Sequence, residues 1–172
     1  MPRLLILLCN HRNIFEKIIN EVYENDVYNL DYLRKCIMET VRLNNPVVSM
    51  FRTLEKDLYI GGKYLTKGTQ LFLLTNPVLR QSEYFEDGYK FKPERWTKEL
   101  ETKTYAISFS QGPQKCPGKE LAIFLIQSFV YNFIKLYKIG QSNKLVCNKK
   151  LNINNIQQVI NTCNVKFTIE KN

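Results

Sequence analysis

Apolar residues recur at every third or fourth position in four stretches of the chain, which is the period of an amphipathic helix. This pattern predicts helices over residues 3–9, 13–23, 29–44 and 119–137. Asn29 is a candidate N-cap of the third helix, because its side chain can accept a hydrogen bond from a free backbone N–H. In the fourth helix we expect a broad apolar face and therefore deep burial. This face consists of Leu121, Leu125, Phe129 and Phe133, with Ala122, Ile126 and Val130 beside them.

Between the third and fourth helices the spacing changes to that of strands and turns. Strands are predicted over residues 57–60, 63–66 and 70–74, and a closing strand over residues 164–170. Gly61-Gly62 separates the first two strands, which indicates a hairpin, and the strand over 70–74 is expected to be buried. An irregular stretch follows over residues 76–110. We therefore expect a single α+β region, mainly α, that covers residues 1–172.

The composition is that of a folded domain, since 44% of the residues are hydrophobic and 24% are charged. Lys and Arg number 25 and Asp and Glu 16, which gives a net charge of +9 and can suit nucleic acid or an anionic membrane. The lysines are spread along the chain without a block of five like charges, so we favour a solvated lysine-rich surface and do not expect nucleic acid as a partner.

No apolar run is long enough to span a bilayer, and no small-residue cleavage site follows the short apolar stretch near the start. We therefore expect a chain without a transmembrane segment that is cytoplasmic or peripherally bound to a membrane, and not secreted. Five cysteines at wide spacing and a single histidine, His11, argue against a disulfide framework and against a structural zinc site.

Cys116 lies in a turn rich in glycine and proline just before the fourth predicted helix, in the segment FSQGPQKCPG over residues 109–118. The free N–H groups at a helix start stabilise a thiolate, and the neighbouring Lys115 and Lys119 act in the same direction. Taken alone, an ordinary buried cysteine is the commoner case. The segment also contains two residues without a Cβ and one aromatic ring, namely Gly112, Gly118 and Phe109. A thiolate on a loop that a flat group can approach closely suits axial ligation of haem iron.

Two further segments carry charged residues at short spacing. Glu39 and Arg42 share a helix face and can pair, and their direction away from the Ile37 and Val41 stripe indicates a solvated ion pair. The segment FKPERW over residues 91–96 by itself indicates a surface turn with a Trp anchor. Neither segment indicates a function alone, but their order along the chain is informative.

In this order, the three segments resemble those of the cytochrome P450 family. The family's haem-binding signature, Phe-x-x-Gly-x-Arg-x-Cys-x-Gly, is matched at Phe109, Gly112, Cys116 and Gly118. Its Glu-x-x-Arg helix motif is matched at Glu39 and Arg42, and its Phe-x-Pro-Glu-Arg motif at residues 91–95. The matches extend over nearly the whole chain and resemble only the C-terminal part of the family.

The resemblance implies that Cys116 is the axial thiolate ligand of haem iron. It also implies that Phe109, Gly112, Gly118 and Arg52 bind the cofactor, Arg52 by reaching a haem propionate. The family's two helix-motif residues and a later arginine form a buried structural network, which here would consist of Glu39, Arg42 and Arg95. One position departs from the signature, since Gln114 replaces the usual basic residue near a propionate. This departure predicts looser haem binding without a change of ligand.

The activity implied by the resemblance is that of a haem-thiolate monooxygenase, an oxidoreductase that uses haem b and takes electrons from NADPH through a reductase. Because the family's distal half has no counterpart here, we expect a truncated chain whose activity is impaired unless a complementary chain supplies the N-terminal half. Two alternatives stay open. One is a non-enzymatic remnant or basic interaction protein, and the other is a haem-binding chain that turns over hydrogen peroxide without a reductase.

Overall fold

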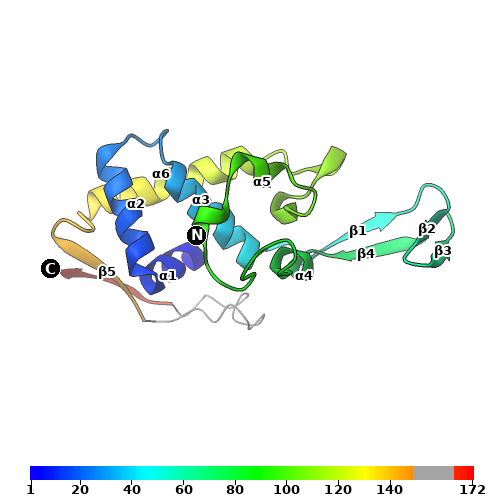
Figure 1. Ribbon diagram of the computed structural model, residues 1–172. Coiled ribbons are helices and arrows are strands. Elements are labelled where there is room, and N and C mark those ends of the chain that lie inside the picture. The colour runs from blue at the N-terminus through cyan, green and yellow to red at the C-terminus, as the bar shows by residue number, and fades with distance from the viewer. Residues whose placement is uncertain (149–164) are drawn as a thin grey trace.

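Four longer helices form the body of the protein, and each lies within a few residues of its predicted position (Figure 1). In the computed structural model, which describes residues 1–148 and 165–172, these helices are α1 (Pro2–Asn10), α2 (Arg12–Glu24), α3 (Asp31–Leu43) and α6 (Lys119–Leu136). The predicted α+β class, mainly α, is confirmed. Within the described ranges, none of the helices combines the length and the apolarity that crossing a bilayer would require.

The hydrophobic core lies where α1, α2, α3 and one side of α6 meet. Each of these helices contributes apolar side chains that are removed from water, which is the main favourable contribution to folding. The fully buried side chains include Ile6, Phe15, Ile18, Leu33, Val130 and Ile134. The core therefore joins the N-terminal helices to the helix that follows Cys116.

The other side of α6 is exposed, so the predicted deep burial is wrong for most of the broad apolar face, although Val130 of that face is buried. Leu121 is 62% exposed and Leu125 is 58% exposed, whereas Ile123 is buried. The stripe that packs against the other helices is the one that contains Ile123, Val130 and Ile134. The sequence pattern shows two apolar stripes on this helix, and only one of them finds a partner among the described residues.

The N-terminus of α3 is capped from α2 and not by Asn29. The Glu21 carboxylate accepts hydrogen bonds from the backbone N–H groups of Tyr32 at 2.7 Å and Leu33 at 2.9 Å. These are first-turn donors without an intrahelical partner. Burial raises the pKa of Glu21 although both hydrogen bonds favour its ionised form. The Asn29 side chain instead donates to Asp26, which lies in the preceding turn.

Two short antiparallel sheets form an arm that extends away from the helices (Figure 1). In them β1 (Ser49–Thr53) pairs with β4 (Gln70–Leu74), and β2 (Leu58–Ile60) pairs with β3 (Lys63–Leu65). The predicted hairpin is thereby confirmed, and Gly61 and Gly62 between its strands both have positive φ, as a tight hairpin turn requires. The predicted burial of residues 70–74 is wrong, because Phe72, Leu73 and Leu74 are exposed on the arm.

The stretch over residues 76–110 is less irregular than predicted. It begins within α4 (Thr75–Arg80) and contains α5 (Lys98–Thr102) and two single-turn 3-10 helices, Pro93–Arg95 and Ile107–Phe109. Thr97 caps α5 by accepting a hydrogen bond from the backbone N–H of Leu100 at 3.1 Å. Helices of one or two turns are too short to show a hydrophobic period, which is why the sequence pattern does not predict them.

A third two-stranded sheet ends the chain. The predicted closing strand is confirmed as β6 (Phe167–Lys171), while residue 164 of the prediction lies outside the described residues. Its antiparallel partner, β5 (Asn143–Cys147), was not predicted, because only Leu145 in this polar segment is fully removed from solvent. Strand β5 of this sheet packs beside α1 (Figure 1).

Candidate functional site

Cys116 lies in a closed turn between a 3-10 helix and the start of α6. Its backbone N–H donates to the carbonyl of Phe109 at 2.9 Å, so residues 109–116 form a closed loop. Gly112 opens a single turn of 3-10 helix (Gly112–Gln114) with a φ of +71°, a conformation that side chains with a Cβ disfavour. Gly118 is the N-cap of α6, so Cys116 lies just outside the first turn of that helix. The Cys116 side chain is exposed.

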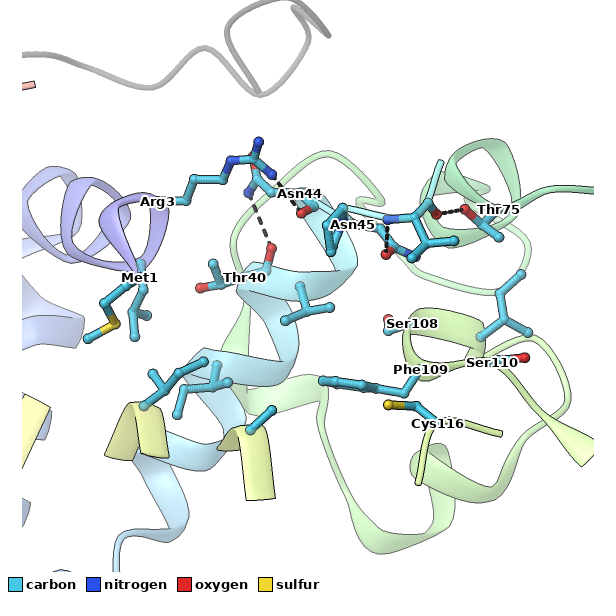
Figure 2. Close-up of a pocket in the computed structure, with 18 of the residues that line it drawn as sticks. Met1, Arg3, Thr40, Asn44, Asn45, Thr75, Ser108, Phe109, Ser110 and Cys116 are labelled. Atoms are coloured by element: carbon cyan, nitrogen blue, oxygen red, sulfur yellow. Dashed lines mark hydrogen bonds between the residues drawn. The ribbon is translucent and has the colours of Figure 1, made fainter. Parts of the chain in front are cut away.

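A cavity of about 640 Å³ opens beside this turn. Figure 2 shows the Cys116 sulfur next to the Phe109 ring, and the Phe109 side chain pointing into the cavity. Most of the surrounding side chains are apolar, among them Leu4, Ile37, Val41, Val47, Met50 and Ile126. Of the described residues in the lining, only Arg3 has a charged side chain, and its Nη1 donates to the backbone oxygen of Asn44 at 3.0 Å.

The same cavity has polar atoms in its wall that lack partners. The Ser108 hydroxyl and the Asn44 Oδ1 are buried and form no hydrogen bond with any described residue. Buried polar atoms without partners are costly, so their position in a cavity wall indicates a site that can satisfy them. Gln114 also lines the cavity, at the position where the haem-binding signature has its basic residue.

Of the residues expected to bind the cofactor, some line the cavity and others do not. Phe109 and Cys116 line the cavity, whereas Gly112 and Gly118 shape the turn without lining it. Arg52 is on β1 and does not line the cavity. Its Nη1 donates to its neighbour's backbone oxygen at 2.8 Å, and its role at a propionate stays a prediction.

Glu39 and Arg42 are completely buried, so their interpretation as a solvated ion pair is wrong. Arg42 donates to both carboxylate oxygens of Glu39, each at 2.8 Å. Glu39 also accepts hydrogen bonds from Arg95 Nε at 3.1 Å, from Trp96 Nε1 at 2.9 Å and from the backbone N–H of Lys92 at 3.0 Å. The three residues expected in the network therefore meet, and Trp96 joins them as a fourth member that the sequence did not predict.

The remaining donors of Arg42 bind the end of α4 and the chain segment that follows it. Its Nη1 donates to the backbone oxygens of Leu79 and Gly88, and its Nη2 to that of Lys90. A Cβ at Gly88 would lie 2.0 Å from the backbone oxygen of Arg80, so only glycine allows this close approach. The guanidinium of Arg42 thus ties α3 to a segment about 40 residues away.

A second group of charged residues surrounds the start of α6. Arg34 on α3 contacts Glu120, and Lys119 contacts Glu101 on α5 at 2.6 Å. The sequence assigned Lys119 to the stabilisation of a Cys116 thiolate, but the structure engages its ammonium with the Glu101 carboxylate. Sequence reasoning missed Arg34, Glu101 and Glu120, because no short-range spacing connects residues on three different helices.

These features agree with the comparisons with known proteins. The family model for cytochrome P450 matches residues 3–163, and the chain belongs to this family. The chain is 34% identical over 115 residues to cytochrome P450 85A2 of Arabidopsis thaliana, which covers 66% of the chain and 25% of that relative. It is 31% identical over 173 residues to cytochrome P450 4ae1 of Drosophila melanogaster, which covers 87% of the chain and 35% of that relative.

A third similar protein is named as a synthase. The (21S)-21-acetyl-1-hydroxy-apo-melianone synthase CYP88A164 of Melia azedarach is 31% identical over 118 residues, covering 69% of the chain and 24% of that relative. The chain thus spans about a quarter to a third of the length of these relatives. The family is one of haem-dependent oxidoreductases that work with redox partners.

The residues around the cavity fit the haem that the family uses. The cavity volume lies within the range of cofactor pockets, roughly 300–1,000 Å³, and its lining is mostly apolar. A cysteine sulfur is present in the wall, and the unpartnered polar atoms of Ser108 and Asn44 offer contacts to a polar edge. Within the described residues, no group of three or more His, Cys, Asp or Glu side chains is placed to hold a metal ion by itself.

Proposed function

We propose that the chain is a haem-binding region of a cytochrome P450 monooxygenase, in which the Cys116 thiolate is the axial ligand of the iron. The observation that carries the proposal is the position of Cys116 in the wall of a mostly apolar cavity, in the turn before α6. A single thiolate ligand is one of the ways in which proteins hold haem iron. In this proposal residues 1–172 form one haem-binding unit.

Different residues of this chain would have different roles in binding the haem. Cys116 would hold the iron, Phe109 would pack beside the sulfur, and Gly112 and Gly118 would keep the turn open to a flat ligand. Ser108 and Gln114 line the cavity and would contact the polar edge of the haem. Glu39, Arg42 and Arg95 would contribute only to the stability of the fold, because their side chains contact one another in the buried network. Arg52 would reach a propionate only after its side chain leaves the Phe51 backbone oxygen.

The bound cofactor, which we propose to be haem b, would supply the activation of dioxygen, and thiolate donation favours cleavage of the O–O bond. One oxygen atom would enter an organic substrate and the other would leave as water, with electrons from NADPH delivered by a reductase. The cavity lining is mostly apolar, but Cys116 itself is an exposed residue, so water can reach this turn. Monooxygenation needs a dry pocket, so we propose that this chain alone turns over substrate poorly and would need a complementary chain.

Carbon monoxide binding to the reduced, haem-loaded protein tests the assignment. A thiolate ligand shifts the Soret band of the carbon monoxide complex to longer wavelength than a neutral ligand does. Cys116→Ser should abolish the shifted band. The matched control is Cys9→Ser, because Cys9 donates a hydrogen bond to the Leu145 backbone oxygen that serine can also form. A shifted band that persists in Cys116→Ser, or that is absent from the unmodified protein, would refute the assignment.

A further inference from the structure

Four charged side chains connect α3, α5 and the first turn of α6 beside the Cys116 turn. Arg34 Nη1 lies 2.7 Å from Glu120 Oε2, and Arg34 Nη2 lies 3.1 Å from Glu120 Oε1. The same Nη2 lies 3.0 Å from Glu101 Oε2, which also accepts a hydrogen bond from Lys119 at 2.6 Å. We call this group the Arg34 cluster.

The Arg34 cluster holds a part of the chain that has few other restraints. The N-cap residue of α6 is Gly118, which has no side chain to cap the free N–H groups of the first turn, so that turn depends on contacts from other residues. Lys119 and Glu120 are the first two residues of that helix, and they follow Cys116 by three and four positions. On the other side, the Cys116 backbone N–H donates to the Phe109 carbonyl, the one backbone hydrogen bond that this N–H forms within residues 1–148 and 165–172. Contacts that move the start of α6 therefore also move the cysteine.

The geometry of Arg34 suits a fixed restraint. Its planar guanidinium binds the Glu120 carboxylate through two parallel N–H donors, an arrangement that fixes direction as well as distance. The Arg34 side chain is only 26% exposed. Burial disfavours ionisation of Glu101, but the hydrogen bonds and charges of Lys119 and Arg34 outweigh this effect and keep its pKa below the usual value. An interconnected, partly buried group of this kind holds its geometry better than an isolated surface pair.

We infer that Arg34 is a positioning residue that sets the place of Cys116 at the cavity by anchoring the first turn of α6. Arg34 does not line the cavity and would not touch the haem. The relevance to iron ligation rests on the proposed function, whereas the anchoring of the turn does not.

Arg34→Gln tests the anchoring, since glutamine keeps most of the length and loses the charge and the paired donors. The matched control is Arg12→Gln, because Arg12 pairs with Glu16 at 3.2 Å within α2 and away from the cysteine turn. In the haem-free chain, hydrogen exchange of the backbone amides over residues 112–122 should become about tenfold faster in Arg34→Gln, as expected for a locally loosened segment. The same amides should be unchanged in Arg12→Gln, and the core helix α2 should be unchanged in Arg34→Gln.

The haem-loaded protein gives the second measurement. The unmodified protein and Arg34→Gln are compared at equal concentrations of folded protein. The fraction of the reduced carbon monoxide complex that shows the thiolate band should fall by at least about half in Arg34→Gln, because the sulfur no longer has one fixed position. Arg34→Lys keeps the charge without the planar fork and should give an intermediate fraction. Should Arg34→Gln fail to fold by circular dichroism, Glu120→Gln removes the same paired contact and leaves Arg34 with Glu101.

The outcomes separate this inference from the proposed function. Faster exchange confined to residues 112–122, together with a smaller thiolate band, supports the inference. Exchange that is unchanged, or that rises equally over the whole chain, overturns it, because Arg34 then contributes at most general stability. A chain that shows no thiolate band even when unmodified refutes the proposed function, and the exchange data still decide whether Arg34 anchors the turn.

Discussion

The network around Glu39 and the turn around Cys116 have equally recognisable sequence signatures, but the protein holds them in opposite ways. Glu39 is completely buried and accepts hydrogen bonds from Arg42, Lys92, Arg95 and Trp96. Cys116 is exposed, and its backbone N–H donates a hydrogen bond to the Phe109 carbonyl. The first arrangement fixes a fold, because a buried carboxylate with this many donors specifies one geometry. The second leaves a reactive atom accessible, as ligand binding requires.

Removal of the central carboxylate should have the largest effect on stability. Glu39→Gln leaves the Arg42 guanidinium buried without a countercharge, which costs about 3–5 kcal/mol in buried pairs of this kind. Denaturant titration measures the change in the free energy of unfolding. Glu16→Gln is the control, since Glu16 forms an exposed pair with Arg12 and should change stability by less than about 1 kcal/mol. Equal effects of the two substitutions would remove the contrast between buried network and surface.

Trp96→Phe should have a smaller effect. Phenylalanine keeps most of the buried ring and loses the indole N–H, so one oxygen of Glu39 loses its 2.9 Å donor. We expect a loss of about 1–3 kcal/mol in the free energy of unfolding, the usual cost of a missing hydrogen bond to a buried charged group. The thiolate band of haem-loaded protein should be unchanged at equal folded fraction. A change in that band without a change in stability would place Trp96 in the cofactor site instead.

Gln114→Arg should act on the Cys116 side alone. Gln114 lines the cavity, and an arginine there can form a charge-assisted hydrogen bond with a carboxylate. We expect about tenfold tighter haem binding in a haem titration, with the free energy of unfolding of the haem-free chain unchanged. Gln141→Arg adds the same charge at an exposed position outside the cavity lining and should leave haem affinity unchanged. Equal gains from both substitutions would indicate general electrostatic attraction and not a specific contact.

Acid should weaken the Arg34 cluster, and this is the smallest of the four predicted effects. The pKa of Glu101 and that of Glu120 are both below the usual value, Glu120 mainly because of its hydrogen bond from Arg34. A carboxyl with a lowered pKa in the folded state contributes stability above its unfolded pKa, and this contribution is lost as pH falls through the folded pKa. The stability difference between the unmodified chain and Arg34→Gln should therefore be full at pH 7 and shrink below about pH 4.5. It should not exceed about 1 kcal/mol, because the Glu120 side chain is exposed. A difference that is constant from pH 7 to pH 3 would contradict this account.

The elements that the sequence predicts are those with a local, periodic signal. The helices α1, α2, α3 and α6 each repeat apolar residues over several turns, and the β2–β3 hairpin has its glycine pair. By contrast, the exposed stripe of α6 and the exposed strand β4 show that apolar residues do not tell which face finds a partner. Burial depends on tertiary packing, which a periodic pattern alone does not contain.

The polar contacts of the site could be predicted only in part, for a related reason. The family resemblance brought Glu39, Arg42 and Arg95 together, although the local pattern indicated a surface pair. Nothing in the spacing places Trp96 Nε1 on Glu39 or Glu21 at the start of α3. These contacts join residues that are distant along the chain or lie on different helices, and they exist only once the core has formed.

X-ray absorption at the iron edge of haem-loaded protein tests the central claim most directly, because it detects the atom bound to the metal. With Cys116 present, the spectrum should show one sulfur neighbour of the iron. In Cys116→Ser that sulfur should be absent, while it should remain in Cys9→Ser. A first shell of nitrogen and oxygen alone in the unmodified chain, or a sulfur neighbour that survives Cys116→Ser, would contradict the assignment of Cys116 as the haem ligand.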